Sequence, residues 1–342
     1  MNSACIYIIG TGTMGRGIAL WSLQCGYNVI VKTRSQESLG KFNTYAEKYF
    51  KHSKLNESEI NSLAEKLQFD LDFSKISQAD IVIECVKEDV LIKHQLYRQI
   101  EPLLRKTAIL VSNTSSLTLE ALNQPLSDKT RFLGIHFFNP VYKLQLVEVS
   151  VTSDSAAWAK QMAIKFIDRL KKHPIYVKSS SGFVVNRILI PYILAAIKIR
   201  ESGISAELID NTMLKGGMPM GPLQVADLVG LDVCLHIAKN LTELDNIAIP
   251  NLLVSMVTDN KCGKKNEIGF YNYSKVKISN DCDNSAADQV IFNRLAAVIR
   301  HQIARCLQDQ VVENIDSINI ALELGAGFPK KLCDVAEYSE YI

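Results

Sequence analysis

A glycine-rich turn near the start of the chain constrains its fold more than any other feature. Residues 10–15 read Gly-Thr-Gly-Thr-Met-Gly and directly follow the apolar run Ile6–Ile9. In a strand–turn–helix unit, three glycines at this spacing permit a tight turn, close approach of a pyrophosphate, and close packing of the helix on the strand. The motif predicts an α/β fold that binds a dinucleotide, with the phosphates at the helix N-terminus. The predicted contacts are Gly10, Gly12, Thr13, Met14 and Gly15.

Seven short β-rich runs alternate with helical patterns through the first half of the chain. They are Cys5–Ile9, Val29–Lys32, Ile81–Cys85, Ala108–Ser112, Phe132–Phe137, Leu144–Val149 and Ile175–Val177. This alternation predicts a Rossmann-type, doubly wound, mostly parallel sheet with helices on both faces. Residues 36–66 are polar and helical in pattern, and they are longer than a crossover helix requires, which indicates a helical insertion.

A small-residue hinge at Ser179–Gly182 predicts a domain boundary, because helical periodicity replaces the β-rich runs beyond it. We expect a dinucleotide-binding domain over 1–180 and an all-helical domain over 181–342. The helical half contains an internal sequence repeat. Asn186 and Asn293 each precede an arginine and are expected to open a helix, and each is followed later in the chain by a similar glycine-rich turn. This pattern predicts two helical units, 181–273 and 288–342, that stack on each other. The alternative is that the similarity between these helical sequences is due to chance.

Composition narrows the possible functions. The chain has 38 basic and 36 acidic residues, so it has no overall field to attract nucleic acid or a membrane surface. Its eight cysteines show no C-x-x-C pair and no metal-ligand spacing, which indicates reduced thiols and no metal site. The first strand begins near residue 4, and the most apolar run, 188–199, is too short to span a bilayer. We therefore expect a cytoplasmic protein.

His136 and Glu148 are the candidate proton-transfer pair. A lone histidine in an apolar strand is more often a buried structural residue, but here the next β-rich run returns a glutamate. A carboxylate bonded to one ring nitrogen fixes the tautomer and raises basicity, leaving the other nitrogen to exchange a proton with substrate. Together with a dinucleotide site, the pair predicts redox interconversion of an alcohol and a ketone by hydride transfer.

A hydroxyl-rich turn, Ser112–Ser116, ends the fourth β-rich run at the edge where doubly wound sheets bind ligands. Ser115 is a candidate to bond the reacting oxygen, and Asn186, just after the hinge, is a second. The alternative is that the turn is only a cap.

The residues after the second β-rich run bear on cofactor choice. Where an Asp or Glu commonly binds the ribose, the chain has Lys32, Thr33, Arg34 and Ser35. A guanidinium can form paired hydrogen bonds with a 2′-phosphate, so Thr33-Arg34-Ser35 favour NADP(H) over NAD(H). The alternative is that Arg34 is a solvated loop charge and that NAD(H) binds through its pyrophosphate.

With these residues assembled, the chain resembles the L-3-hydroxyacyl-CoA dehydrogenase family along nearly its whole length. The matching stretches are Gly10–Gly17, Glu84–Glu88, Ser112–Leu117, His136–Pro140, Leu146–Val149, Gly182–Arg187, Pro219–Pro222 and Gly269–Tyr271. The resemblance implies interconversion of (3S)-3-hydroxyacyl and 3-ketoacyl thioesters. It implies His136 as general acid/base, Glu148 as its partner, and Ser115 and Asn186 around the substrate oxygen.

The same resemblance implies further contacts and also exposes departures. The cofactor would be lined by Glu88, Lys93, Asn113, Ser115, Asn139 and Lys265, and the insertion at 36–66 would help to hold CoA. Thr33 replaces the family's acid, Ala195 replaces a glutamate in its Pro-Tyr-x-x-Glu-Ala run, and Glu267 replaces a glycine.

Several alternatives stay open at this point. The substrate could be an acyl group on a carrier protein in a biosynthetic pathway, or a free hydroxy acid. The chain could also be a dinucleotide-binding protein without catalysis, since a fold alone does not prove turnover. A second helical unit in one chain resembles the dehydrogenase part of larger multifunctional enzymes, so either a monomer or a homodimer is expected.

Overall fold

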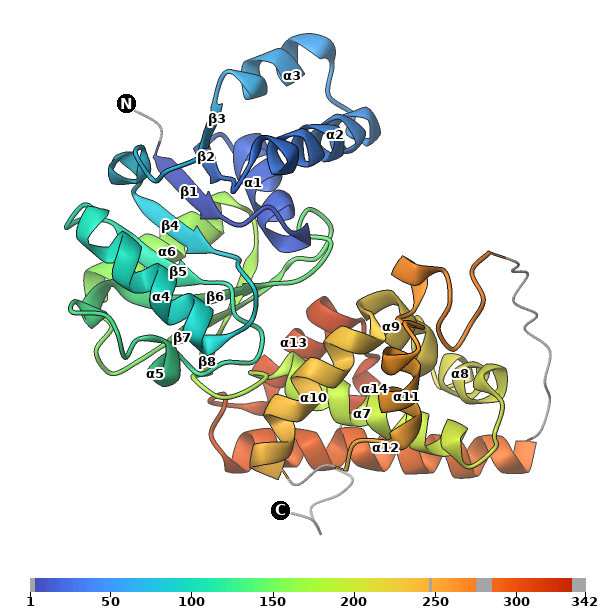
Figure 1. The fold of residues 1–342 in the computed structure, drawn as a ribbon. Coiled ribbons are helices and arrows are strands. Elements are labelled where there is room, and N and C mark those ends of the chain that lie inside the picture. The colour runs from blue at the N-terminus through green and yellow to red at the C-terminus, as the bar shows by residue number, and fades with distance from the viewer. Residues whose placement is uncertain (1–3, 246–247, 275–284, 334–342) are drawn as a thin grey trace. The chain divides into compact units, whose positions relative to one another are not determined.

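The computed structural model describes residues 4–245, 248–274 and 285–333, and its backbone separates into two compact units (Figure 1). The first unit ends at Ser179 and the second begins at Ser180. This division falls inside the hinge of small residues at Ser179–Gly182.

The first unit is built on one sheet of eight strands. Its strands are β1 Cys5–Ile9, β2 Asn28–Lys32, β3 Leu67–Asp70, β4 Ile81–Glu84, β5 Ile109–Ser112, β6 Phe132–Phe137, β7 Leu146–Val151 and β8 His173–Lys178. Their order is β3-β2-β1-β4-β5-β6-β7-β8. Neighbours pair in parallel except β6 and β7, which are antiparallel. The predicted doubly wound, mostly parallel sheet is confirmed.

Helices cover both faces of this sheet because alternate strand residues face opposite sides. The helices are α1 Thr13–Gln24, α2 Gln36–His52, α3 Glu57–Ala64, α4 Val90–Ile100, α5 Leu119–Leu122 and α6 Ala157–Arg169, with short 3₁₀ turns at Ile76–Gln78, Glu101–Leu103 and Lys129–Arg131. One core joins Ile6 and Ile8 to α1, α2 and α6, and the other joins Tyr7 and Ile9 to α4 and α5.

Strand β3 and a break in the inserted helical segment are absent from the sequence prediction. β3 is short and half-exposed at the sheet edge, so its residues lack the apolar run that identified the other strands. The insertion forms two helices, α2 and α3. Asn56 separates them with a capping box, because its side chain accepts from the Glu59 amide while the Glu59 carboxylate accepts from the Asn56 amide.

The second unit is helical around a central buried helix, α7. Its helices are α7 Val185–Glu201, α8 Ala206–Lys215, α9 Pro222–Val229, α10 Leu231–Asp245, α11 Asn251–Thr258, α12 Ser285–Gln308, α13 Ile315–Ala326 and α14 Lys330–Cys333, with a 3₁₀ turn at Lys264–Asn266. α7 packs against α9, α10, α12 and α13. The predicted all-helical character of this half is confirmed. Across the described ranges, we find no helix with the length and apolarity needed to cross a bilayer.

One detail of the predicted internal repeat is wrong. Asn186 lies in the first turn of α7, as expected, but Asn293 lies well inside α12 because that helix already begins at Ser285. The residues before Asn293 contain no helix breaker, and Asp288 among them is held by the Thr212 hydroxyl and the Lys215 ammonium. The two asparagines are therefore not equivalent in position.

Candidate active site

The glycine turn between β1 and α1 has the geometry that a pyrophosphate requires. Gly10 has φ of +115°, and a Cβ at Gly15 would lie 2.0 Å from the carbonyl oxygen of Gly10. Gly12 caps α1 without any side-chain hydrogen bond, the first turn has no acidic residue, and no atom lies within 4 Å of a Cβ built there. The open N-terminus of α1, with Thr13 and Met14 as its first residues, fits a dinucleotide phosphate.

His136 and Glu148 are direct partners across the antiparallel pair β6–β7. Nδ1 of the imidazole lies 2.7 Å from Oε2 of the carboxylate, and both side chains are buried. The Phe138 ring lies against the imidazole, with centroids 4.5 Å apart. Because the carboxylate engages Nδ1, proton exchange with a substrate would use Nε2.

The Ser112–Ser116 turn is held by the carboxylate of Glu88. Oε1 of Glu88 accepts from the amide of Ser115 at 2.7 Å, the amide of Ser116 at 3.0 Å and the hydroxyl of Thr114 at 2.6 Å. Burial alone would raise the pKa of Glu88, but the Lys93 ammonium and these donors lower it to about 2. Ser115 is thus positioned by an ionised neighbour.

Lys93 lies between two carboxylates in the interior of the first unit. Its Nζ is 2.9 Å from both Glu84 and Glu88, and the side chain is 1% exposed. Burial opposes its charge, but the two anions raise the pKa of Lys93 above its ordinary value. Tyr97 and Ser112 donate to the Glu84 carboxylate at 2.8 and 2.9 Å. Glu84 is missing from the predicted site, although a glutamate inside the apolar run Ile81–Cys85 is a signal that the sequence contains.

Asn113 connects the hydroxyl-rich turn to the histidine strand. Its side-chain oxygen accepts from the amide of Phe137 at 3.0 Å, one residue beyond His136. Asn139 follows β6 at a cis Asn139–Pro140 bond in the connection to β7. The structure therefore gathers His136, Glu148, Ser115, Asn113, Asn139, Glu88 and Lys93 at the ends of β4, β5 and β6, where α/β sheets bind ligands.

The segment after β2 presents one exposed cation. Thr33 is buried, its amide donates to the Asp70 carbonyl at 3.0 Å, and its hydroxyl has no partner among the described residues. The Ser35 hydroxyl caps α2 by accepting from the Ser38 amide. Among these three predicted cofactor-selecting residues, Arg34 has an exposed side chain that makes no hydrogen bond or ion pair with the described residues.

Two predicted residues belong to the second unit and are placed within it. Asn186 lies in the first turn of α7, and Lys265 lies in the 3₁₀ turn Lys264–Asn266, where its ammonium pairs with Asp232. Glu267, which replaces the family's glycine, ends this turn with φ of +63°, a conformation that favours glycine. Ala195 is half-buried on α7.

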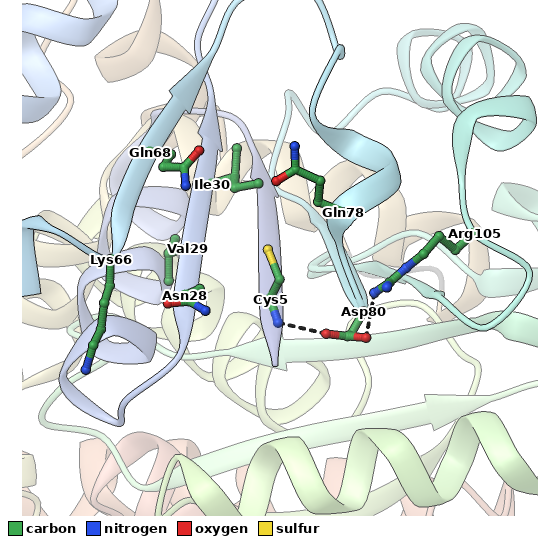
Figure 2. A pocket seen from close by; sticks show the side chains of 9 residues that line it. All are labelled: Cys5, Asn28, Val29, Ile30, Lys66, Gln68, Gln78, Asp80 and Arg105. Atoms are coloured by element: carbon green, nitrogen blue, oxygen red, sulfur yellow. Dashed lines mark hydrogen bonds and ion pairs between the residues drawn. The ribbon is translucent and has the colours of Figure 1, made fainter. Parts of the chain in front are cut away.

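A pocket of about 530 Å³ lies at the other end of the sheet (Figure 2). Its lining residues are Cys5, Asn28, Val29, Ile30, Lys66, Gln68, Gln78, Asp80 and Arg105. Cys5 and Asn28 are the first residues of β1 and β2, so this pocket opens at the amino ends of the strands. Arg105 and the Cys5 amide both bond Asp80 there. None of the predicted site residues lines this pocket.

The described part of the chain contains no candidate metal site. There, no group of three or more His, Cys, Asp or Glu side chains could hold a metal ion. Six cysteines, Cys5, Cys25, Cys85, Cys234, Cys262 and Cys306, are free thiols.

Comparison with known proteins shows the family to which this chain is related. The family model for the NAD binding domain of 3-hydroxyacyl-CoA dehydrogenase matches residues 5–180, and the model for its C-terminal domain matches residues 182–273. A fatty acid oxidation complex subunit alpha from Psychrobacter sp. strain PRwf-1 is 31% identical over 94% of this chain and 48% of that protein. The chain spans about half the length of the curated relatives it matches.

Solved structures agree with this relationship. The (S)-3-hydroxybutyryl-CoA dehydrogenase PaaH1 from Ralstonia eutropha is 33% identical with a TM-score of 0.72, over 80% of this chain and all of that one. The dehydrogenase part of multifunctional enzyme 1 from C. elegans is 27% identical with a TM-score of 0.65, over 96% of this chain and 80% of that one. These matches, together with the glycine turn after β1, show that the chain belongs to the 3-hydroxyacyl-CoA dehydrogenase family of NAD-dependent oxidoreductases.

Proposed function

We propose that the protein interconverts (3S)-3-hydroxyacyl-CoA and 3-ketoacyl-CoA thioesters. The observation that carries the proposal is the His136–Glu148 pair, joined at 2.7 Å in a buried position at the ligand-binding edge of a sheet that also carries a dinucleotide turn. Such a pair can move the hydroxyl proton of a secondary alcohol at neutral pH.

In the oxidation direction, His136 takes the proton of the C3 hydroxyl at Nε2. Glu148 stabilises the resulting imidazolium through Nδ1, and in the reduction direction the same imidazolium returns the proton to the oxygen. Ser115 would hold that oxygen so that the proton and the hydride leave in one geometry.

The residues around the glycine turn would hold the cofactor. Bound nicotinamide supplies the acceptor or donor of the C3 hydride at its C4 atom. The backbone of Gly10–Gly15 binds the pyrophosphate at the start of α1. Glu88, Asn113 and Asn139 would line the rest of the dinucleotide site, and Lys93 lies buried behind Glu88.

The choice between NAD(H) and NADP(H) rests on Arg34. Its exposed guanidinium stands after β2, where the family's acid is replaced by Thr33, and nothing acidic replaces that charge among Thr33, Arg34 and Ser35. A 2′-phosphate fits such a cation better than it fits an acid. We therefore propose that the enzyme accepts NADP(H) better than its acid-bearing relatives do. Comparing kcat/KM for NADH and NADPH in wild-type protein and Arg34→Ala tests this, and an unchanged strong NADH preference in both refutes it.

The substrate class is tested by direct comparison of three ketones. We expect fast cofactor oxidation with acetoacetyl-CoA, slower reaction with the same acyl group on a carrier protein, and little with free acetoacetate. Preference for the carrier-bound group would replace CoA with a carrier protein as the partner. Cofactor binding without turnover of any of these compounds would contradict the proposal.

A further inference from the structure

The buried carboxylate of Glu84 is surrounded by hydrogen-bond donors. These are the amide of Val86 at 3.0 Å, the ammonium of Lys93 at 2.9 Å, and the hydroxyls of Tyr97 at 2.8 Å and Ser112 at 2.9 Å. Every one of these groups donates, and an ionised carboxylate is the form that only accepts. The Glu84 carboxylate therefore forms an ion pair with Lys93 and accepts three further hydrogen bonds inside the protein.

Glu84, Lys93 and Glu88 form a charge triad with one cation between two anions. The exposed fractions of the three side chains are 0%, 1% and 19%, respectively. Lys93 balances one carboxylate, so the triad has a net charge of −1. Solvent screens a charge in this position far less than it screens a surface charge.

The triad lies next to the place where the reaction occurs, if the proposed function is correct. Glu88 Oε1 is 2.7 Å from the Ser115 amide nitrogen, and Ser115 is proposed to bond the reacting oxygen. Hydride transfer needs reacting atoms about 3–3.5 Å apart. The nicotinamide C4 must therefore come within roughly 10 Å of the triad during the reaction.

Charge in this position distinguishes the two redox forms of the cofactor. The oxidised nicotinamide ring is a cation, and the reduced ring is neutral. A net charge of −1 on the order of 10 Å away, at an effective dielectric constant of about 20, changes the affinity for the cation about tenfold and leaves the neutral form almost unaffected.

We propose that Glu84 is a specificity-determining residue that shifts the site's preference toward the oxidised dinucleotide. Without Glu84, the Lys93–Glu88 pair would be neutral. With it, the oxidised form gains affinity that the reduced form does not. Because binding and redox equilibria are linked, this makes the bound reduced cofactor a stronger hydride donor and favours reduction of the ketone on the enzyme. Glu148 contributes another negative charge, but it is the same in all variants considered below.

The test is the ratio of two dissociation constants, measured by calorimetry or by cofactor fluorescence without any substrate. In Glu84→Gln, we expect Kd for NAD⁺ to rise about tenfold relative to Kd for NADH. Tyr97→Phe is the matched control, because it removes a neutral donor to the same carboxylate, and its ratio should equal that of wild type. Glu84→Asp keeps the charge and should retain most of the wild-type ratio. If the wild-type protein prefers the 2′-phosphorylated cofactor, the same ratio is measured with NADP⁺ and NADPH.

An unchanged ratio in a folded Glu84→Gln protein overturns the inference. If that variant does not fold, Glu88→Gln removes the same charge from the partly exposed end of the triad and must shift the ratio in the same direction, and failure to do so also overturns it. This inference rests on the proposed function, which acetoacetyl-CoA turnover by wild-type protein tests separately. Turnover with an unchanged ratio refutes the role of Glu84 alone, whereas absence of turnover refutes the proposed function.

Discussion

The imidazole of His136 is bonded to Glu148 because the two residues face each other directly across β6 and β7. Their neighbours Ile135, Phe137, Val147 and Val149 all enter the core that contains α1 and α6. Strand alternation therefore turns both His136 and Glu148 to the opposite face. Their contact is a property of the sheet rather than of a flexible loop.

Replacing His136 tests the assignment of the base. We expect His136→Gln to lower kcat by about 10²–10⁴-fold, the usual contribution of a positioned general acid/base. Cofactor affinity should change little, because the dinucleotide turn is separate from the imidazole. Steady-state kinetics with acetoacetyl-CoA and a binding titration with NADH measure the two effects. A variant that retains most of its rate would show that another group moves the proton.

Glu88 should make stability depend on pH in the acid range. Its pKa is about 2 in the folded protein against an ordinary value of 4.5, so the unfolded chain binds its proton first as pH falls. The stabilisation is complete above pH 4.5 and is lost as pH falls toward 2, amounting to about 3 kcal/mol.

Urea unfolding of wild type and Glu88→Gln over this pH range measures that contribution. The stability of wild type should fall more steeply than that of the variant. Glu47→Gln, a surface change on α2, serves as the control and should follow wild type. Parallel curves for wild type and Glu88→Gln would contradict the prediction.

Glu267 offers a test of backbone strain. It has φ of +63°, a conformation in which a residue with a side chain is strained by about 1–2 kcal/mol. Glycine avoids this strain, but part of the gain in stability is lost because glycine has more conformational entropy in the unfolded chain. We expect Glu267→Gly to stabilise the second unit by about 0.5–1 kcal/mol. Gly203→Ala is the opposite test, because φ is +103° there and no atom crowds the new Cβ, so strain alone should lower stability. Thermal unfolding of both variants measures these effects, and a destabilised Glu267→Gly refutes the strain.

Two buried tyrosines should respond oppositely to loss of their hydroxyls. The Tyr192 hydroxyl has no hydrogen-bond partner in the described ranges, whereas the Tyr271 hydroxyl donates to buried Asp210 at 2.7 Å. Tyr192→Phe removes an unsatisfied polar group and should raise stability by up to about 1 kcal/mol. Tyr271→Phe should lower stability by about 1–3 kcal/mol. Denaturant unfolding of the pair measures both, and equal effects would exclude this explanation.

Much of the fold is readable from sequence because the signals are local. Apolar runs such as Ile81–Cys85 identify buried strands, and the glycine spacing identifies the β1–α1 turn. The hairpin arrangement of β6 and β7 allows His136 and Glu148 to share a face, and the observed register makes them direct partners. β3 lacked such a signal, since Leu67–Asp70 is only partly buried and follows a helical segment.

The charge triad is not readable in the same way. Glu84 and Glu88 come from the end of β4 and the loop after it, and Lys93 comes from α4, so their contact depends on how the helix packs on the sheet. Sequence alone does not reveal that a lysine in an amphipathic helix is buried. Likewise, nothing in the pattern around Asn293 shows that α12 begins eight residues earlier, because a helix without a breaker can extend in either direction.

The connection between β6 and β7 covers residues 138–145, and the register of the two strands places His136 opposite Glu148. In a hairpin, the length of the connection contributes to that register. A substitution at an exposed position within it, such as Tyr142 or Lys143, leaves the register and the His136–Glu148 hydrogen bond unchanged. An insertion or deletion of one residue shifts the pairing and separates the imidazole from the carboxylate. Exchange of side chains at constant length is therefore the change that this connection tolerates.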